Sequence, residues 1–200
     1  MDFVETLKSV GGVKPCPVCG VPSAIVCETL CNTCHGTGQV LDLAPLLAKP
    51  DLMEECAKEL LLKYAEIHNH SKTDKTDFGP AGIPRDKLII VGPQRAHSLV
   101  YEVARQLGGT AVVVIEEDAD QQSVDWNKPR DKDYRLSLPV PPDATVLFVT
   151  DRWDVKEMSP IYMTVINEKT KFTMLPYILS LMSDTEYFDS LKIISLYQDK

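Results

Sequence analysis

The sequence contains no apolar run long enough to cross a lipid bilayer. Its most apolar late stretch, FTMLPYILSLM at 172–182, has about half the length of a membrane-spanning helix and contains a proline. The opening residues, MDFVETLKSVGG, carry neither the basic segment nor the apolar segment of a secretory signal peptide. From these absences we predict a cytoplasmic protein with no membrane partner.

A concentrated basic segment is missing as well. The chain has 21 lysines and arginines against 29 aspartates and glutamates, and its formal net charge is −8. The densest basic group, NKPRDKDYR at 127–135, is interleaved with aspartates, which is typical of a solvated loop. Because proteins that bind nucleic acids generally present a basic surface, we do not expect a nucleic acid as a partner.

Repeats and low-complexity tracts are absent apart from two cysteine pairs. With 44% apolar residues, the 200-residue chain can bury the core of one ordinary domain and carry a small additional module. Three segments are predicted: a cysteine-rich module at 1–45, a helix and polar linker at 46–86, and an α/β domain at 87–200. The helix has an apolar stripe at three- and four-residue spacing. This stripe consists of Met53, Cys56, Leu60, Tyr64 and Ile67.

The two cysteine pairs indicate a metal site. Each pair has the spacing CxxC, and eleven residues separate the pairs. Two residues between cysteines allow both sulfurs to reach one ion, and four thiolates suit tetrahedral Zn²⁺ in a closed, structural site. The pattern resembles that of zinc ribbons, and CNTCHGTG at 31–38 also resembles one repeat of the DnaJ-type chaperones. The predicted zinc ligands are Cys16, Cys19, Cys31 and Cys34.

The sequence also allows other roles for the cysteines. Cys27 or His35 lies close enough in sequence to replace one of the four predicted ligands. Free thiols or a redox pair would also use a CxxC spacing, although the doubled motif favours zinc. Cys56 lies on the apolar stripe of the predicted helix, so we expect it to be a core residue.

Strand and helix patterns alternate from Lys87 onward. Short apolar runs, typical of strands buried on both faces, are separated by segments with a helical apolar stripe. This alternation predicts an α/β fold around a mostly parallel sheet. Helices are predicted at 95–109 and at 159–169, the second with Ser159 as its cap and Pro160 at its first position. Strands are predicted at 87–92, 110–117, 134–140 (an edge strand), 144–151, 172–181 and 191–197.

The segment from Lys87 to Tyr197 resembles the type I phosphoribosyltransferase fold, most nearly the orotate phosphoribosyltransferase branch. KLIIVGP resembles the strand that leads to the pyrophosphate loop, and ATVLFVTD the strand that carries the motif for phosphoribosyl pyrophosphate (PRPP). The resemblance implies two adjacent acids that hold ribose hydroxyls, then a small, glycine-containing loop whose amides hold a phosphate. It also implies a homodimer and, if the protein is active, Mg²⁺ as a cofactor.

The PRPP motif of this chain departs from that pattern. Thr150-Asp151 stands where two acids are expected, so one carboxylate is missing. The following RWDVKEM, at 152–158, has large side chains and no glycine, which hinders close approach of the backbone to a phosphate. Acidic residues would also repel PRPP, so we expect phosphoribosyl transfer to be very weak or absent. The repelling residues are Glu116, Glu117, Asp154 and Glu157.

The resemblance still assigns candidate site residues. Arg95, near a predicted helix N-terminus, would meet an anion, and Asp151 would bind a ribose hydroxyl; both would be catalytic in an active protein. Alternatively, Arg95 is only a surface charge, and Asp151 is a carboxylate that caps a helix or loop. The polar loop at 117–133 lies where related transferases have a mobile loop. Its candidate phosphate contacts are Lys128, Arg130 and Lys132. The predicted ligand-binding set is Gly92, Pro93, Gln94, Arg95, Thr150, Asp151, Arg152 and Asp154.

Together these observations predict a divergent phosphoribosyltransferase-like protein that binds a nucleotide or a phosphorylated sugar. If active, it would transfer a phosphoribosyl group to or from a base. The alternative is a catalytically inactive, zinc-containing scaffold that binds a protein partner. Trp126 and Trp153 lie in predicted loops, where either indole would stack on a base or, more commonly, pack against the domain.

Overall fold

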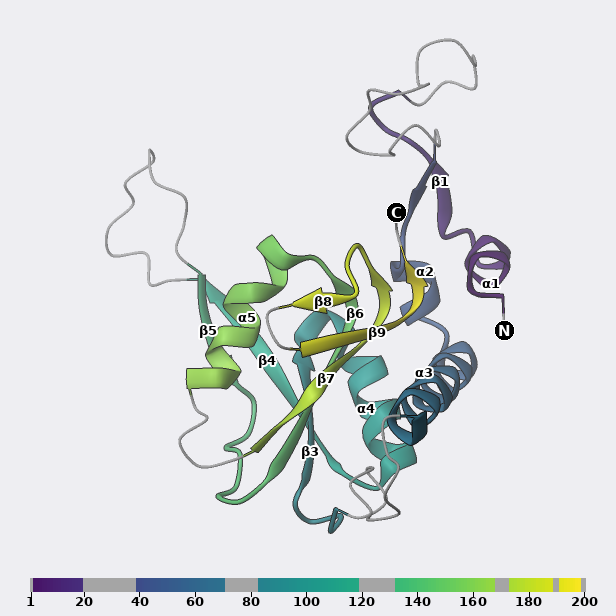
Figure 1. Cartoon of the computed structure of the whole chain (residues 1–200). Coiled ribbons are helices and arrows are strands. Elements are labelled where there is room, and N and C mark those ends of the chain that lie inside the picture. The colour runs from purple at the N-terminus through teal and green to yellow at the C-terminus, as the bar shows by residue number, and fades with distance from the viewer. Residues whose placement is uncertain are drawn as a thin grey trace. The chain divides into compact units, whose positions relative to one another are not determined.

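A computed structural model of the chain describes residues 2–19, 39–70, 83–118, 132–167, 173–188 and 191–198. The chain divides into two units, Met1–Met53 and Glu54–Lys200 (Figure 1). The first contains a small hairpin with short helices, and the second contains the sheet. No helix among the described residues is both long and apolar enough to span a membrane.

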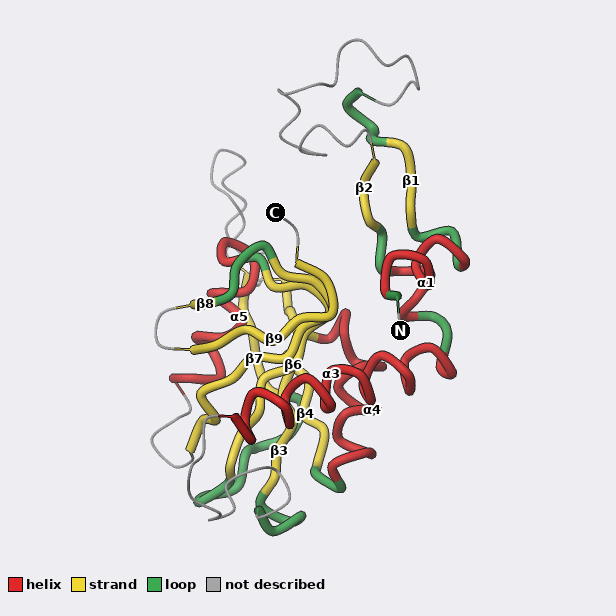
Figure 2. The backbone as a smooth tube through the Cα atoms, turned by 45° about the vertical axis from the view of Figure 1, so that its right-hand side comes forward, coloured by secondary structure: helices red, strands yellow, loops and turns green. Residues whose placement is uncertain are grey.

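The first unit begins with helix α1 (Phe3–Ser9), which the Asp2 carboxylate caps by accepting hydrogen bonds from two first-turn amides. Strands β1 (Val13–Pro15) and β2 (Gln39–Leu41) then pair antiparallel, as Figure 2 shows. Helix α2 (Ala44–Leu47) follows the hairpin. The buried apolar side chains of α1, α2 and the residue before α2 are Phe3, Leu7, Leu43 and Leu46.

Helix α3 (Pro50–His70) spans the boundary between the units and carries the predicted apolar stripe. Cys56, Leu60 and Tyr64 are at most 2% exposed, which confirms that this face of the helix is buried. Burial, reinforced by two neighbouring glutamates, raises the pKa of the Cys56 thiol to about 12. The thiol therefore stays protonated and packs as a small apolar group, as the sequence predicted.

The second unit contains a seven-stranded sheet in the order β5-β4-β3-β6-β7-β9-β8. The five inner strands are parallel, and the two edge strands, β5 and β8, are antiparallel to their neighbours. This arrangement confirms the predicted α/β fold with a mostly parallel sheet. The strands are β3 (Leu88–Pro93), β4 (Thr110–Asp118), β5 (Lys132–Leu136), β6 (Thr145–Trp153), β7 (Thr173–Ser183), β8 (Tyr187–Phe188) and β9 (Leu191–Gln198).

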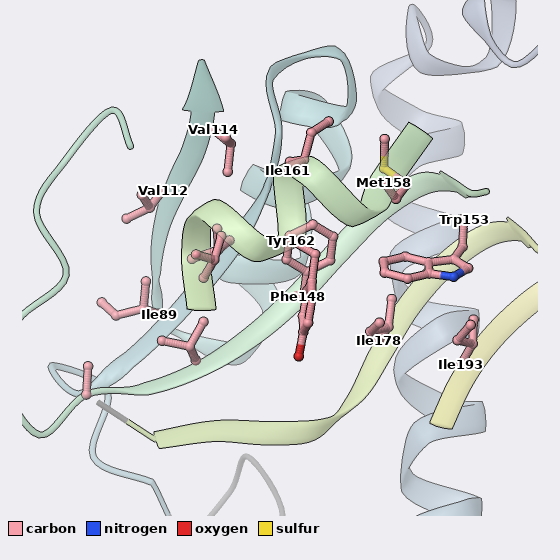
Figure 3. Packing of buried hydrophobic residues seen from close by; sticks show 14 residues of the cluster. Ile89, Val112, Val114, Phe148, Trp153, Met158, Ile161, Tyr162, Ile178 and Ile193 are labelled. Atoms are coloured by element: carbon pink, nitrogen blue, oxygen red, sulfur yellow. The ribbon is translucent and has the colours of Figure 1, made fainter. Parts of the chain in front are cut away.

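Helices cover both faces of this sheet. A short 3₁₀ turn, η2 (Gln94–Ala96), connects β3 to α4 (His97–Leu107), which packs against β3 and β4. Helix α5 (Val155–Asn167) contributes to the core of the other face, whose close packing Figure 3 shows. Because side chains alternate along a strand, β3 sends Ile89 and Val91 towards the α5 core. Every residue of β3 is buried, as expected of a strand covered on both faces.

The start of α5 differs from the sequence prediction. The helix begins at Val155, and Pro160 lies inside it rather than at its first position. The Asp154 carboxylate is the cause, because its Oδ1 accepts hydrogen bonds from the N–H groups of Lys156 (2.8 Å) and Glu157 (3.1 Å). The predicted start at Ser159 is therefore wrong. Since β6 continues to Trp153, RWDVKEM is not a loop but a strand end followed at once by a helix.

Gly92 is needed where β3 passes between β6 and α4. A Cβ atom at this position would lie 2.0 Å from the Val149 carbonyl oxygen and 2.6 Å from Cγ2 of Val100. Both neighbours belong to packed elements, and one of them is backbone, so neither can move aside freely. The glycine thus has a packing role that is independent of any ligand.

We predict that Gly92→Ala lowers the free energy of unfolding by about 1–3 kcal/mol or more, because the added methyl group overpacks the sheet. Urea unfolding of both proteins measures the effect. Gln94→Ala, an exposed position two residues away, is the matched control and should change stability by no more than about 0.5 kcal/mol. Equal stability of Gly92→Ala and the wild type would contradict this packing.

Candidate functional site

A pocket of about 480 Å³ opens at the carboxyl ends of β3 and β4. The carboxyl ends of strands are where open α/β sheets usually bind ligands. The volume lies within the roughly 300–1,000 Å³ typical of small-molecule pockets. Its apolar walls come from Pro93, Val114, Tyr134 and Ile161, and its polar groups from Gln94, Arg95, His97, Glu116 and Glu157.

Arg95 is held by two carboxylates from different elements. Its Nε donates to Oδ1 of Asp151 at the end of β6, at 3.1 Å, and its Nη1 donates to Oε1 of Glu157 in the first turn of α5. The remaining nitrogen, Nη2, lies 3.9 Å from the sulfur of Met158. All three guanidinium nitrogens therefore already face groups of the chain itself.

These contacts also fix the charge of Arg95. Partial burial of the guanidinium disfavours its charged form, but the fields and hydrogen bonds of Asp151 and Glu157 outweigh this cost and raise the pKa of Arg95. The guanidinium is therefore a permanent cation whose charge is compensated within the chain. An incoming phosphate would have to compete with Glu157 or Asp151 for it.

Asp151 lies behind Arg95 rather than on the wall of the pocket. Its side chain is 10% exposed, and its Oδ1 lies 3.1 Å from the hydroxyl oxygen of Thr150 as well as facing Arg95. Thr150 is completely buried, and its Oγ1 also approaches the Arg152 carbonyl oxygen at 3.1 Å. The predicted contact of Asp151 with a ribose hydroxyl stays a prediction; in this structure its partner is Arg95.

Asp154 occupies the amides at which the family resemblance expects a phosphate. Its carboxylate accepts hydrogen bonds from the N–H groups of Lys156 and Glu157, two of the N–H groups in the first turn of α5. A side-chain carboxylate thus satisfies donors that an oxyanion of a ligand would otherwise use. Glycine is absent from this turn, so the backbone is also screened by side chains.

Trp153 fills the space next to that turn. Its side chain is 1% exposed, and its ring lies against Phe148, Tyr162 and Phe188, with ring centroids 6.1, 6.0 and 5.1 Å away. Figure 3 shows the indole at the end of β6, next to Met158 and above Ile178 and Ile193. The prediction that Trp153 lies in a loop is wrong, and the prediction that it packs against the domain is confirmed.

The other predicted ligand residues fall into two groups. Pro93 and Gln94 line the pocket with Arg95, so the structure brings this part of the set together. Gly92 and Thr150 are buried beneath it, and Arg152 is exposed near the end of β6. His97 also reaches the pocket, with its Nδ1 3.0 Å from the Gln94 carbonyl oxygen.

Several predicted residues lie outside the described part of the chain. They include Lys128 and Arg130 of the polar loop, and Trp126. The backbone of the loop is described at its two ends, where Asp118 of β4 pairs with Lys132 of β5. Strand β4 thus ends one residue later than the sequence indicated, whereas β5 begins earlier but ends at Leu136 and not at 140, so the predicted end of the edge strand is wrong. The role predicted for the loop stays a prediction.

The predicted zinc module is described in its first half. Cys16 and Cys19 follow β1, the first buried and the second partly buried, while Cys31 and Cys34 lie outside the described residues. Within the described ranges, no three potential metal ligands gather at one place. Because Pro15 pairs with Gln39, the hairpin brings together the two ends of the segment that contains both cysteine pairs.

Sequence reasoning missed three residues of the pocket wall: Val114, Tyr134 and Ile161. Tyr134 pairs directly with Glu116 across the antiparallel edge strand, so the register of β4 and β5 would have placed it there. Ile161 was assigned to a helix that was predicted to begin four residues later than it does. Glu157 was noted as a repelling charge, but its pairing with Arg95 depends on the helix start and was not foreseen.

No family model and no curated protein matches the chain in sequence. Its structure resembles several solved phosphoribosyltransferases. The orotate phosphoribosyltransferase of Aeropyrum pernix aligns over 98% of this chain and 93% of that chain, with a TM-score of 0.55 and 14% identity. The adenine phosphoribosyltransferase of Trypanosoma brucei aligns over 99% and 80%, with a TM-score of 0.55 and 9% identity. The chain has the phosphoribosyltransferase fold.

The UMP synthase of Leishmania donovani is similar as well, with a TM-score of 0.54 and 11% identity. The alignment covers 98% of this chain but 35% of that longer chain, so the likeness concerns about a third of the synthase. At such identities the comparison establishes the fold alone. The comparison confirms the fold resemblance inferred from the order of strands and helices. It does not determine the activity, which has to be argued from the residues of the site.

We predict that Asp151→Asn lowers the free energy of unfolding by about 1–3 kcal/mol, because Arg95 loses the better buried of its two charged partners. Glu157→Gln is the matched control: its carboxylate is 55% exposed, and its removal should cost less than about 1 kcal/mol. Chemical denaturation at constant salt measures both. An equal or larger loss in Glu157→Gln would contradict the assignment of Asp151 as the principal partner of Arg95.

Proposed function

We propose that the second unit is a divergent phosphoribosyltransferase-fold protein that binds a ribose-bearing ligand of the nucleotide class in the Arg95 pocket. We propose further that ordinary phosphoribosyl transfer from PRPP is very weak or absent. The observation that carries this proposal is the pairing of Arg95 with both Asp151 and Glu157.

Ligand binding is supported by the form of the pocket. It lies where α/β sheets of this kind bind small molecules, and it combines apolar walls with a few converging polar groups. Tyr134 is partly exposed and offers a surface for the flat, largely apolar face of a base, while Val114 and Ile161, 2% and 7% exposed, belong to the core beneath the pocket lining. The polar side chains at the same place offer hydrogen bonds to a sugar or to the edge of the base.

The loss of transfer is supported by the electrostatics of the same residues. Transfer from PRPP depends on stabilising a departing pyrophosphate, which needs donors that are free to meet negative charge. In this chain Glu157 and Asp151 already pair with Arg95, and Asp154 already accepts hydrogen bonds from two amides in the first turn of α5. Mg²⁺ bound to the phosphates of PRPP would supply positive charge that the site lacks, so each test with PRPP is made both with and without Mg²⁺.

The zinc module is a second, independent proposal. We propose that Cys16, Cys19, Cys31 and Cys34 hold one structural Zn²⁺ ion. The β1–β2 hairpin supports this, because it closes the segment that contains both pairs and leaves Cys16 buried at its end. Such a site would stabilise the small first unit, whose described core consists of a few side chains.

A protein-binding scaffold remains the rival function. Helix α5 supports it, because Val155 and Met163 are 39% and 46% exposed on a helix that otherwise buries its apolar residues. An apolar surface of this kind is what a protein partner would contact, but two exposed side chains alone are common on monomeric proteins. Failure of the pocket to bind any ligand, together with a stable dimer in solution, would favour the scaffold over the ligand-binding protein.

We predict no Mg²⁺-dependent release of pyrophosphate when the protein is incubated with PRPP and each of the common bases. Ligand-induced thermal shifts with nucleosides and nucleoside monophosphates, measured in the same buffers, should detect binding, because a ligand of the native state raises its stability. Robust turnover that Asp151→Asn abolishes would overturn the proposed loss of transfer. The absence of a shift with every ligand would overturn ligand binding.

Zinc binding predicts about one equivalent of Zn²⁺ per chain after purification under reducing conditions. Replacing Cys19 or Cys34 by serine should release the metal and unfold the first unit, since ligation supplies much of its folding energy. Cys56→Ser is the control, because this buried core cysteine lies outside the module and the variant should retain zinc. Metal analysis that finds well under half an equivalent in the wild type would overturn the zinc site.

A further inference from the structure

The charges around the pocket are unbalanced. Among the described residues that line it, Arg95 is the only lysine or arginine, whereas Glu116 and Glu157 are both carboxylates of the wall. Asp151 adds a third carboxylate directly behind the guanidinium. Two of these carboxylates, Asp151 and Glu157, pair directly with Arg95, so a phosphate approaching the guanidinium would meet negative charge beside it.

Glu157 has the decisive position among these carboxylates. Asp151 contacts Nε from the buried side, so the Nη1 edge is the part of the guanidinium that a ligand in the pocket would approach. Glu157 already binds this edge. Its backbone is held in place because its N–H donates to Asp154 at 3.1 Å, so the carboxylate is presented to Arg95 from an anchored helical turn.

We infer that Glu157 determines the ligand class of the pocket by occupying the anion-binding edge of Arg95, so that the pocket selects an uncharged nucleoside over the corresponding nucleoside monophosphate. This inference rests on the proposed ligand-binding function and specifies its ligand. It replaces the nucleotide or phosphorylated sugar expected from the sequence with a ribose-bearing ligand that lacks the phosphate.

A nucleoside matches the pocket groups other than the guanidinium of Arg95, which include carboxylates and apolar side chains. Ribose hydroxyls donate hydrogen bonds, which the carboxylates of Glu116 and Glu157 can accept. The base would lie against the side chain of Tyr134. A 5′-phosphate adds no favourable contact in this setting, because the guanidinium that would bind it is engaged by Glu157.

The test compares matched pairs of probes: adenosine with AMP, and uridine with UMP, by calorimetric titration at one fixed ionic strength without Mg²⁺. In the wild type we expect at least one nucleoside to bind about tenfold or more tightly than its monophosphate. In Glu157→Gln the Nη1 edge becomes available to an anion, so this preference should shrink by about tenfold or reverse. The glutamine keeps the size of the side chain, and thermal unfolding verifies the fold of the variant.

Glu55→Gln is the control, because it removes one negative charge from an exposed position of α3 and should leave the preference unchanged. A wild-type preference for the monophosphate would overturn the inference and leave the proposed function intact. An unchanged ratio in Glu157→Gln would overturn the role of Glu157. If none of the four probes binds either protein, the inference fails together with the proposed function.

Discussion

The pairing of Arg95 with Asp151 and Glu157 is the interaction on which the site depends. It joins three elements that are distant in sequence: the turn after β3, the end of β6 and the first turn of α5. The two carboxylates more than offset the cost of partly desolvating the guanidinium. The same pairing means that a phosphate entering the pocket would have to compete with Asp151 and Glu157 for the guanidinium of Arg95. The local stability of the site and its poor suitability for PRPP therefore have one cause.

Elsewhere in the site, too, side chains of the chain itself satisfy groups or fill space that a ligand would otherwise use. Asp154 satisfies the amides of α5, and Trp153 fills the volume at the end of β6 with an aromatic ring. Positions where the family resemblance implies a ligand are thus occupied by side chains of the chain itself. The sheet and its helices do not depend on the ligand, because their cores lie below this edge. A fold can in this way persist while the chemistry at its carboxyl edge changes.

Much of the fold could be predicted from the sequence because it depends on local apolar patterns. The buried runs at β3, β4 and β6 identify strands covered on both faces, and their alternation with helical stripes gives the parallel sheet. The start of α5 could not be predicted, because Asp154 and the Ser-Pro pair at 159–160 are both good initiation signals and only the structure decides between them. The pairing of Arg95 with Glu157 depends on that start and on tertiary geometry.

In the proposed function, Arg95 is already engaged by Asp151 and Glu157 and does not meet the pyrophosphate of PRPP. The Nε–H of Arg95 reports on this directly in ¹H–¹⁵N NMR spectra, where its signal is assigned by its loss in Arg95→Lys. The account predicts that this signal stays unchanged when Mg²⁺ and PRPP are added, because Asp151 and Glu157 keep their hydrogen bonds to the guanidinium. A saturable shift of the Arg95 signal with PRPP would contradict it.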